Sequence, residues 1–170
     1  MIYFFIILLA LVLYFVLVFI LSHLFIPHLG FDDDQVPEKI PADMLDMIKQ
    51  LAEKAGSAQH FLELSYEFLG KKYRSERFNT VLKFNYLFKD LDQAWQASDY
   101  MPCTQSNFLL RIFLIKSGFF KDDDIKRKYV FANFVPHQYL QVRVNEQWIN
   151  VDVGEKQRGL SLGKYLKYFG

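Results

Sequence analysis

The chain has 170 residues, with 20 Lys and Arg against 19 Asp and Glu and a net charge of +1 at pH 7. So balanced a charge excludes strong electrostatic attraction to nucleic acid, which is not expected as a partner. A single cysteine excludes an intramolecular disulfide and any metal site built from several cysteines. The charged residues all lie in 32–170, a stretch long enough for one compact domain with its own core.

An almost entirely apolar run extends from residue 2 to residue 26, with Ala10, Ser22 and His23 as mild exceptions. About twenty helical residues span the roughly 30 Å of a bilayer's hydrocarbon core, so this run is long enough to cross it. The start of the chain is not basic, which argues against a cleaved signal peptide, and the run has no polar face, which argues against a buried core helix. We therefore predict a transmembrane anchor over 1–29 that contacts the lipid bilayer through 2–26.

The orientation of this anchor depends on few residues. Lys39 is the first basic residue after it and lies close to Asp32, Asp33, Asp34 and Glu38. The tendency of basic flanks to stay in the cytoplasm therefore has almost nothing to act on. The acidic flank favours export, so we expect a single-pass membrane protein whose remaining domain is extracytoplasmic.

A polar segment with two prolines, 30–41, is predicted to link the anchor to a single domain over 42–170. Two acidic runs, 32–34 and 122–124, lack the spaced ligands, central glycine and closing glutamate of a calcium-binding EF-hand loop. Each run is predicted to be solvated surface or the start of a helix.

Helical periodicity marks the first half of the domain. Apolar residues recur at helical spacing over 44–55, and Gly56 is placed to end that helix. A second helix is predicted to begin at Ser57, its N-cap, and to stop at Gly70. The aromatic-rich segment 80–88 is compatible with either a helix or a strand.

Cys103 precedes a strongly apolar segment that is predicted to form a helix ending near Gly118. Pro102 is tolerated at the start of a helix but not inside one, so Cys103 lies at or within one residue of the helix N-terminus. The N–H groups and dipole there favour a thiolate and lower the cysteine pKa from about 8.5. The alternative is that Cys103 is a small buried hydrophobic residue, as many lone cysteines are.

Three strands are expected next, over 128–134, 137–144 and 147–153, with Asn145 and Glu146 as a two-residue turn. The domain is therefore predicted to be α+β, with helices packed on a small antiparallel sheet. Pairing the last two strands through the turn gives one apolar face, which we assign to the core: Leu140, Val142, Val144, Ile149, Val151 and Val153.

The same register places His137 and Asp152 on the opposite face as diagonal neighbours, about 7–8 Å apart at the backbone and within reach of a hydrogen bond. Together with Cys103 they form a thiol nucleophile, a histidine base and a carboxylate that orients the base. Taken separately, His137 and Asp152 are also compatible with an ordinary surface pair. Two further histidines, His23 and His28, belong to the predicted anchor, and the remaining one, His60, is interpreted as a surface residue. Neither a metal nor an organic cofactor is expected.

The stretch from Cys103 to Asp152 resembles the transglutaminase-like superfamily. In that family a cysteine begins an apolar helix, a strand of the form H-x-W-x-E-V follows, and then W-x-x-x-D. The corresponding residues are His137-Gln138-Tyr139-Leu140-Gln141-Val142 and Trp148-Ile149-Asn150-Val151-Asp152. The departures are Tyr139 for tryptophan, Gln141 for an acid and Val153 where proline is common. The resemblance implies a papain-like fold and a Cys103–His137–Asp152 triad, with Trp95, Gln96 and Tyr100 as unranked candidates for a second oxyanion donor.

The function expected from these residues is that of a membrane-anchored cysteine acyl-transfer enzyme acting on a protein or peptide amide through a thioester. Hydrolysis is preferred over cross-linking, although the resemblance implies both. The alternative is a membrane-tethered interaction domain of the same fold that does no chemistry. The sequence leaves open whether 44–55 or 160–169 covers the cleft.

Overall fold

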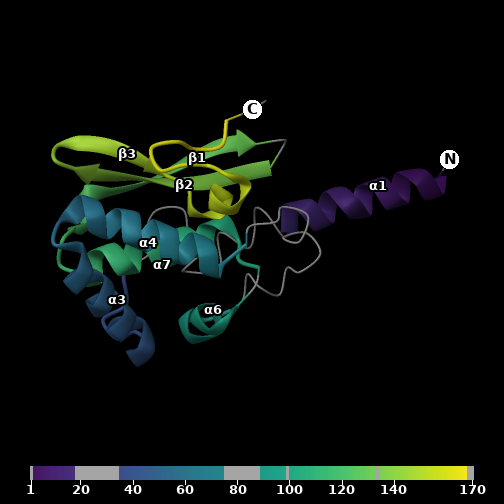
Figure 1. Cartoon of the computed structure of the whole chain (residues 1–170). Coiled ribbons are helices and arrows are strands. Elements are labelled where there is room, and N and C mark those ends of the chain that lie inside the picture. The colour runs from purple at the N-terminus through teal and green to yellow at the C-terminus, as the bar shows by residue number, and fades with distance from the viewer. Residues whose placement is uncertain (1, 18–34, 75–88, 99, 133–134, 168–170) are drawn as a thin grey trace.

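The computed structural model describes residues 2–17, 35–74, 89–98, 100–132 and 135–167. After the first helix, these residues form a small α+β domain in which helices come first and a three-stranded antiparallel sheet follows (Figure 1).

Helix α1, Ile2–Phe15, has 14 residues and none of them is buried. No helix among the described residues is both long and apolar enough to cross a membrane. The predicted transmembrane anchor over 1–29, and the single-pass location with an extracytoplasmic domain, are therefore wrong. Residues 18–29 of that prediction lie outside the described part of the chain.

Helix α3, Ala42–Ala55, ends and helix α4, Ala58–Lys72, begins at local signals read from the sequence. Gly56 ends α3 in the left-handed conformation, with φ of 64°, which glycine adopts without a steric penalty. The hydroxyl of Ser57 accepts a hydrogen bond from the His60 backbone N–H and caps α4. These boundaries agree with the predicted ones.

Gly70 does not end α4, because the helix continues to Lys72. Gly70 is buried, and a Cβ at this position would overlap Lys156 Cγ and lie 2.7 Å from Lys156 Cβ. Glycine is therefore required here for the close approach of another segment rather than for a chain reversal.

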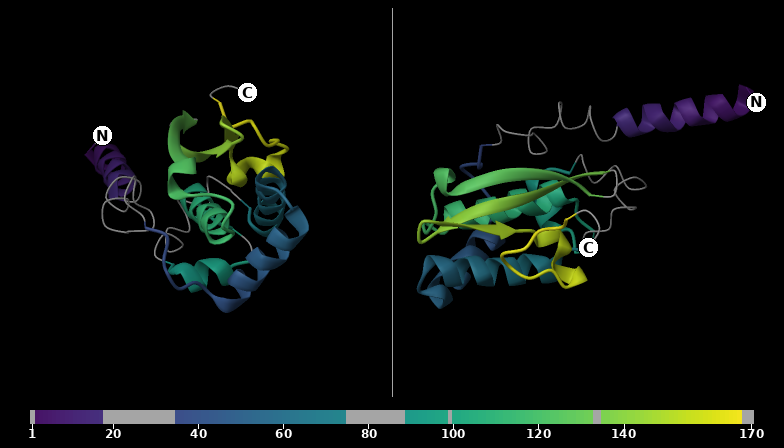
Figure 2. Two further views of the ribbon diagram at one scale, coloured as in Figure 1. Left: turned by 90° about the vertical axis from the view of Figure 1, so that its left-hand side faces the viewer. Right: turned by 90° about the horizontal axis from the view of Figure 1, so that it is seen from above.

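Helix α7, Cys103–Lys116, runs through the middle of the domain, and most of its 14 residues are buried. Seen end-on in the left view of Figure 2, it has the sheet on one side and α4 beside it. The short helix α6, Leu91–Gln96, contributes Trp95, whose ring packs against Phe113 of α7 with centroids 5.8 Å apart. Cys103 is the first residue of α7 and follows Pro102, as predicted.

The sheet has the order β1, Ile125–Ala132; β2, Val135–Val144; β3, Gln147–Val151. Asn145 and Glu146 form the two-residue turn between β2 and β3, both with positive φ, as the tight turns of hairpins require. Leu140 pairs with Val151 and Val144 with Gln147, so the predicted register is confirmed.

The inner face of the sheet packs against α7 and, with the helices, forms one core. The strand residues assigned to this face are buried, except for the half-buried Ile149. The last strand differs from the prediction, because β3 ends at Val151 and Asp152 begins a 3-10 segment, η5, Val153–Arg158. Segment η5 packs against α4 and α7 (Figure 2).

Of the two acidic runs, the second forms a single 3-10 turn, η4, Asp122–Asp124, whose carboxylates bind Arg111 and Arg143. The first run, 32–34, lies outside the described residues, as does 80–88, for which helix and strand were both left open.

Candidate active site

Cys103 is the free thiol of the chain, and it lies partly exposed at the first position of α7. The first N–H groups of a helix have no acceptor within that helix, so the positive end of the helix dipole faces the sulfur. The remainder of the first turn is closed by the Ser106 N–H, which donates to Pro102 O at 3.0 Å. The thiol is thus held at a helix start that favours negative charge.

His137 lies on β2 and Asp152 lies directly after β3. The imidazole Nε2 and the Asp152 Oδ2 are 2.8 Å apart, and both side chains are buried, with 5% of His137 and 1% of Asp152 exposed. The predicted contact between these two residues is therefore present. It forms where β3 has ended and Asp152 precedes the 3-10 segment η5.

The other neighbour of the imidazole is Cys103, whose thiol and His137 are hydrogen-bonded. Burial alone would lower the pKa of His137, but hydrogen bonds to Asp152 and Cys103, together with their negative charges, raise it to about 10. Because Nε2 faces Asp152, the nitrogen left for Cys103 is Nδ1. The imidazolium form is therefore favoured.

The pKa of Cys103 shifts in the direction opposite to that of His137. Burial by its dense surroundings would raise the pKa of the thiol, yet its pKa is lowered, because His137 donates a hydrogen bond and carries a positive charge. The backbone N–H of Gln138 adds a further hydrogen bond to the sulfur, while the charge of Asp152 works weakly against the lowering. These shifts favour a thiolate–imidazolium pair near neutral pH.

Asp152 is held by the C-terminal segment as well as by His137. The Leu166 backbone N–H donates to the same Oδ2 at 3.1 Å, and the neighbouring Tyr165 ring stacks on Tyr139 of β2. Of the two segments left open for covering this region, the C-terminal one lies here, whereas α3 packs into the core with Met44 and Ile48 buried. The C-terminal segment therefore covers β2 near His137, which the sequence had left open.

Comparisons of this chain with known proteins found no relative. No protein-family model matches the sequence. No curated protein matches it, and no solved structure does either. The chemistry proposed for the site therefore depends on its own geometry.

Trp95 and Gln96, two of the candidate oxyanion donors, face another part of the molecule. The Trp95 indole N–H donates to Asp43 Oδ2 at 2.8 Å, and the Gln96 side-chain amide donates to the same oxygen at 3.1 Å. Both donors thereby tie α6 to the start of α3. The third candidate, Tyr100, is buried, with 1% of its surface exposed. None of the three forms a described hydrogen bond with Cys103.

Sequence reasoning missed two residues here: Gln138, whose backbone N–H is a partner of the thiol, and Asn107, which binds Gln138. Asn107 follows Cys103 by one helical turn, and its side-chain Nδ2 donates to the Gln138 carbonyl oxygen at 2.7 Å. Gln138 in turn presents its backbone N–H to the thiol. The spacing of four residues between Cys103 and Asn107 was a usable signal, because such residues share one face of a helix.

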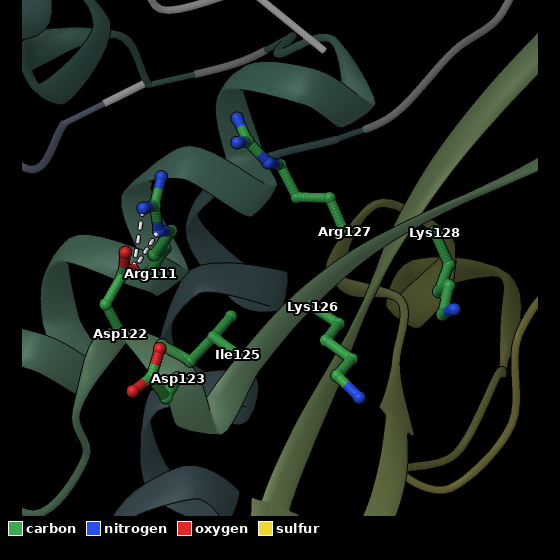
Figure 3. A pocket seen from close by; sticks show the side chains of 7 residues that line it. All are labelled: Arg111, Asp122, Asp123, Ile125, Lys126, Arg127 and Lys128. Atoms are coloured by element: carbon green, nitrogen blue, oxygen red, sulfur yellow. Dashed lines mark hydrogen bonds and ion pairs between the residues drawn. The ribbon is translucent and has the colours of Figure 1, made fainter. Parts of the chain in front are cut away.

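A separate hollow of about 390 Å³ lies between β1 and α7 and contains none of the three predicted residues. Figure 3 shows Arg127 extending from β1 towards α7, while Lys126 and Lys128 extend from the opposite face of the strand. Arg111 is engaged there by Asp122, with Nη2 and Oδ1 2.7 Å apart. Among the described residues, no group of three or more His, Cys, Asp or Glu side chains is arranged to hold a metal ion.

Proposed function

We propose that this chain is a cysteine acyl-transfer enzyme that hydrolyses amide bonds in a protein or peptide substrate. The observation that carries the proposal is the position of the His137 imidazole, which is hydrogen-bonded to Asp152 on one side and to Cys103 on the other. Nucleophile, base and orienting carboxylate within hydrogen-bond reach are what thiol-based acyl transfer requires. The order of Cys103, His137 and Asp152 also resembles the transglutaminase-like superfamily.

The reaction proceeds in two steps. The Cys103 thiolate attacks the amide carbonyl carbon, and negative charge develops on the oxygen near the start of α7, where the helix N–H groups stabilise it. The His137 imidazolium then donates its proton to the departing amine, and a thioester to Cys103 is left. Neutral His137 next accepts a proton from water, whose oxygen attacks the thioester and releases a carboxylic acid. The acid product transfers its proton away, and the thiolate–imidazolium pair is restored.

Hydrolysis is proposed in preference to cross-linking because Cys103 is partly exposed, so that solvent water reaches a thioester at this position. An amine acceptor would have to outcompete that water. Mass spectrometry of products formed with and without a labelled primary amine separates the two reactions. Hydrolysis predicts cleaved peptides that carry no label.

The alternative is an interaction domain of the same fold that does no chemistry. Alkylation of the full chain by iodoacetamide tests this directly, because Cys103 is the single cysteine. If the chain is an enzyme, iodoacetamide should alkylate Cys103 near neutral pH far faster than it alkylates free cysteine. His137→Ala should remove that excess rate. Equal rates in the wild type, His137→Ala and free cysteine favour the inert domain.

A further inference from the structure

Cys103 and Asn107 together occupy one edge of β2. Strand β3 ends at Val151, opposite Leu140, so the backbone of Gln138 has no partner strand on that side. In an antiparallel strand the N–H and C=O of one residue point to the same edge. At Gln138 the helix α7 takes the place of β3: the N–H is bonded to the sulfur of Cys103 and the C=O to the amide of Asn107.

We propose that Asn107 is a positioning residue for the nucleophile, and that it acts by holding the Gln138 N–H against the Cys103 sulfur. This deepens the proposed function and rests on it. Asn107 is buried, with 1% of its surface exposed, and its Nδ2 contacts both the Gln138 backbone O at 2.7 Å and the Gln138 side-chain Oε1 at 3.3 Å. Two bonds from one amide fix Gln138 relative to α7.

The orientation of the Asn107 amide is determined by its surroundings. Both neighbouring oxygens belong to Gln138 and accept hydrogen bonds, so a reversed amide would bring oxygen against oxygen. The Asn107 Oδ1 is buried and has no hydrogen-bond partner among the described residues. A buried amide that leaves its acceptor unbonded is costly to stability, which fits a side chain retained for its donor.

The Gln138 side chain adds a third attachment, because its Nε2 donates to the Tyr129 hydroxyl of β1 at 2.7 Å. Gln138 is thereby tied to β1 through its side chain and to α7 through its backbone. A hydrogen bond from an N–H to a thiolate stabilises the charged form and lowers the thiol pKa, provided that the N–H stays aligned. Loosening Gln138 should therefore weaken the thiolate without removing any reacting group.

The first test measures the pH dependence of Cys103 alkylation in the full chain for the wild type and Asn107→Leu. We expect the pH midpoint to rise by about 0.5–1 unit, which makes alkylation below that midpoint about three- to tenfold slower. Ile48→Ala, which opens the buried α3 contact far from the sulfur, serves as a control for lost stability alone. It should lower the melting temperature and leave the midpoint unchanged.

A second pair of variants tests the N–H itself. Gln138→Pro removes the donor, which points to the edge of β2 away from β1. Gln138→Leu keeps the N–H and loses the side-chain bonds to Tyr129 and Asn107. The midpoint should rise in Gln138→Pro and rise less in Gln138→Leu. Midpoints equal to that of the wild type in both Asn107→Leu and Gln138→Pro would overturn the inference, even while His137→Ala still shifts. An unshifted His137→Ala would instead overturn the proposed function.

Discussion

Tyr139 and Tyr165 stack face to face, with ring centroids 4.3 Å apart and planes 7° from parallel. This contact joins β2 to the C-terminal segment one residue before Leu166, whose N–H holds the Asp152 carboxylate. The stacked pair therefore fixes the backbone that supports the orienting acid.

Removing one ring of this pair should loosen that backbone. Tyr165→Ala is expected to lower the free energy of unfolding by about 1–2 kcal/mol, because the stacking and part of its apolar burial are lost. Hydrogen exchange at the Leu166 amide should become faster in the same variant. Tyr165→Phe keeps the stacked ring and should retain most of the protection. An unchanged exchange rate in Tyr165→Ala would show that the stack does not hold the segment.

The charge of Asp152 should determine the pH above which acyl-transfer activity falls. The ion pair persists between the lowered pKa of Cys103 and the pKa of His137 near 10, so alkylation and acyl transfer should form a plateau between them. Asp152→Asn removes a carboxylate that raises the His137 pKa, and the basic limb of acyl transfer should move towards neutral pH. Asp122→Asn, which disturbs only the Arg111 pair, should leave that limb in place.

Stability should depend on pH through the same histidine. The pKa of His137 is raised in the folded state, so its contribution is complete below its unfolded value of about 6.5 and is lost as pH rises through about 10. The difference in unfolding free energy between the wild type and His137→Ala should therefore shrink from pH 7 to pH 11. Urea unfolding at several pH values measures it. A difference that stays constant over this range contradicts the raised pKa.

Gly70 should tolerate no side chain despite its place in a helix. Alanine normally stabilises a helix relative to glycine by about 0.5–1 kcal/mol, but here its Cβ would overlap the Lys156 side chain. We expect Gly70→Ala to destabilise the chain by about 1–3 kcal/mol. Lys156→Gly in the same chain should relieve most of this loss, so a double-mutant cycle with the single variant Lys156→Gly measures the coupling. Additive effects would contradict the steric account.

Trp95 should affect stability and leave the thiol unchanged. Trp95→Phe removes the indole N–H that binds Asp43 and part of the contact with Phe113, so the unfolding free energy should fall by about 1–3 kcal/mol. The pH midpoint of Cys103 alkylation should not move, because the donor faces α3 rather than the sulfur. A shifted midpoint would restore Trp95 as a candidate for the active site.

The hairpin was predictable because its signals are local. Alternating valines define one face, and the two-residue turn at Asn145 and Glu146 fixes the register, so the approach of His137 to Asp152 followed from the pattern alone. The start of α7 was equally local, since Pro102 cannot lie inside a helix.

The errors came from contacts between distant segments. Glycine is a usual sign of a helix end, but at position 70 it is required because the Lys156 side chain leaves no room for a Cβ. The C-terminal segment has no periodic pattern, so the stacking of Tyr165 on Tyr139 could not be predicted from the sequence. The membrane anchor was predicted from composition alone, and no helix among the described residues is long and apolar enough to cross a membrane.

In the β2–β3 hairpin, β2 is the longer strand and extends past the end of β3, so a lengthening of β3 would alter the site. A β3 arm two residues longer would lay its own backbone beside Gln138 and displace the sulfur from that position. Insertions just before Asp152 should thus convert a reactive edge into ordinary sheet.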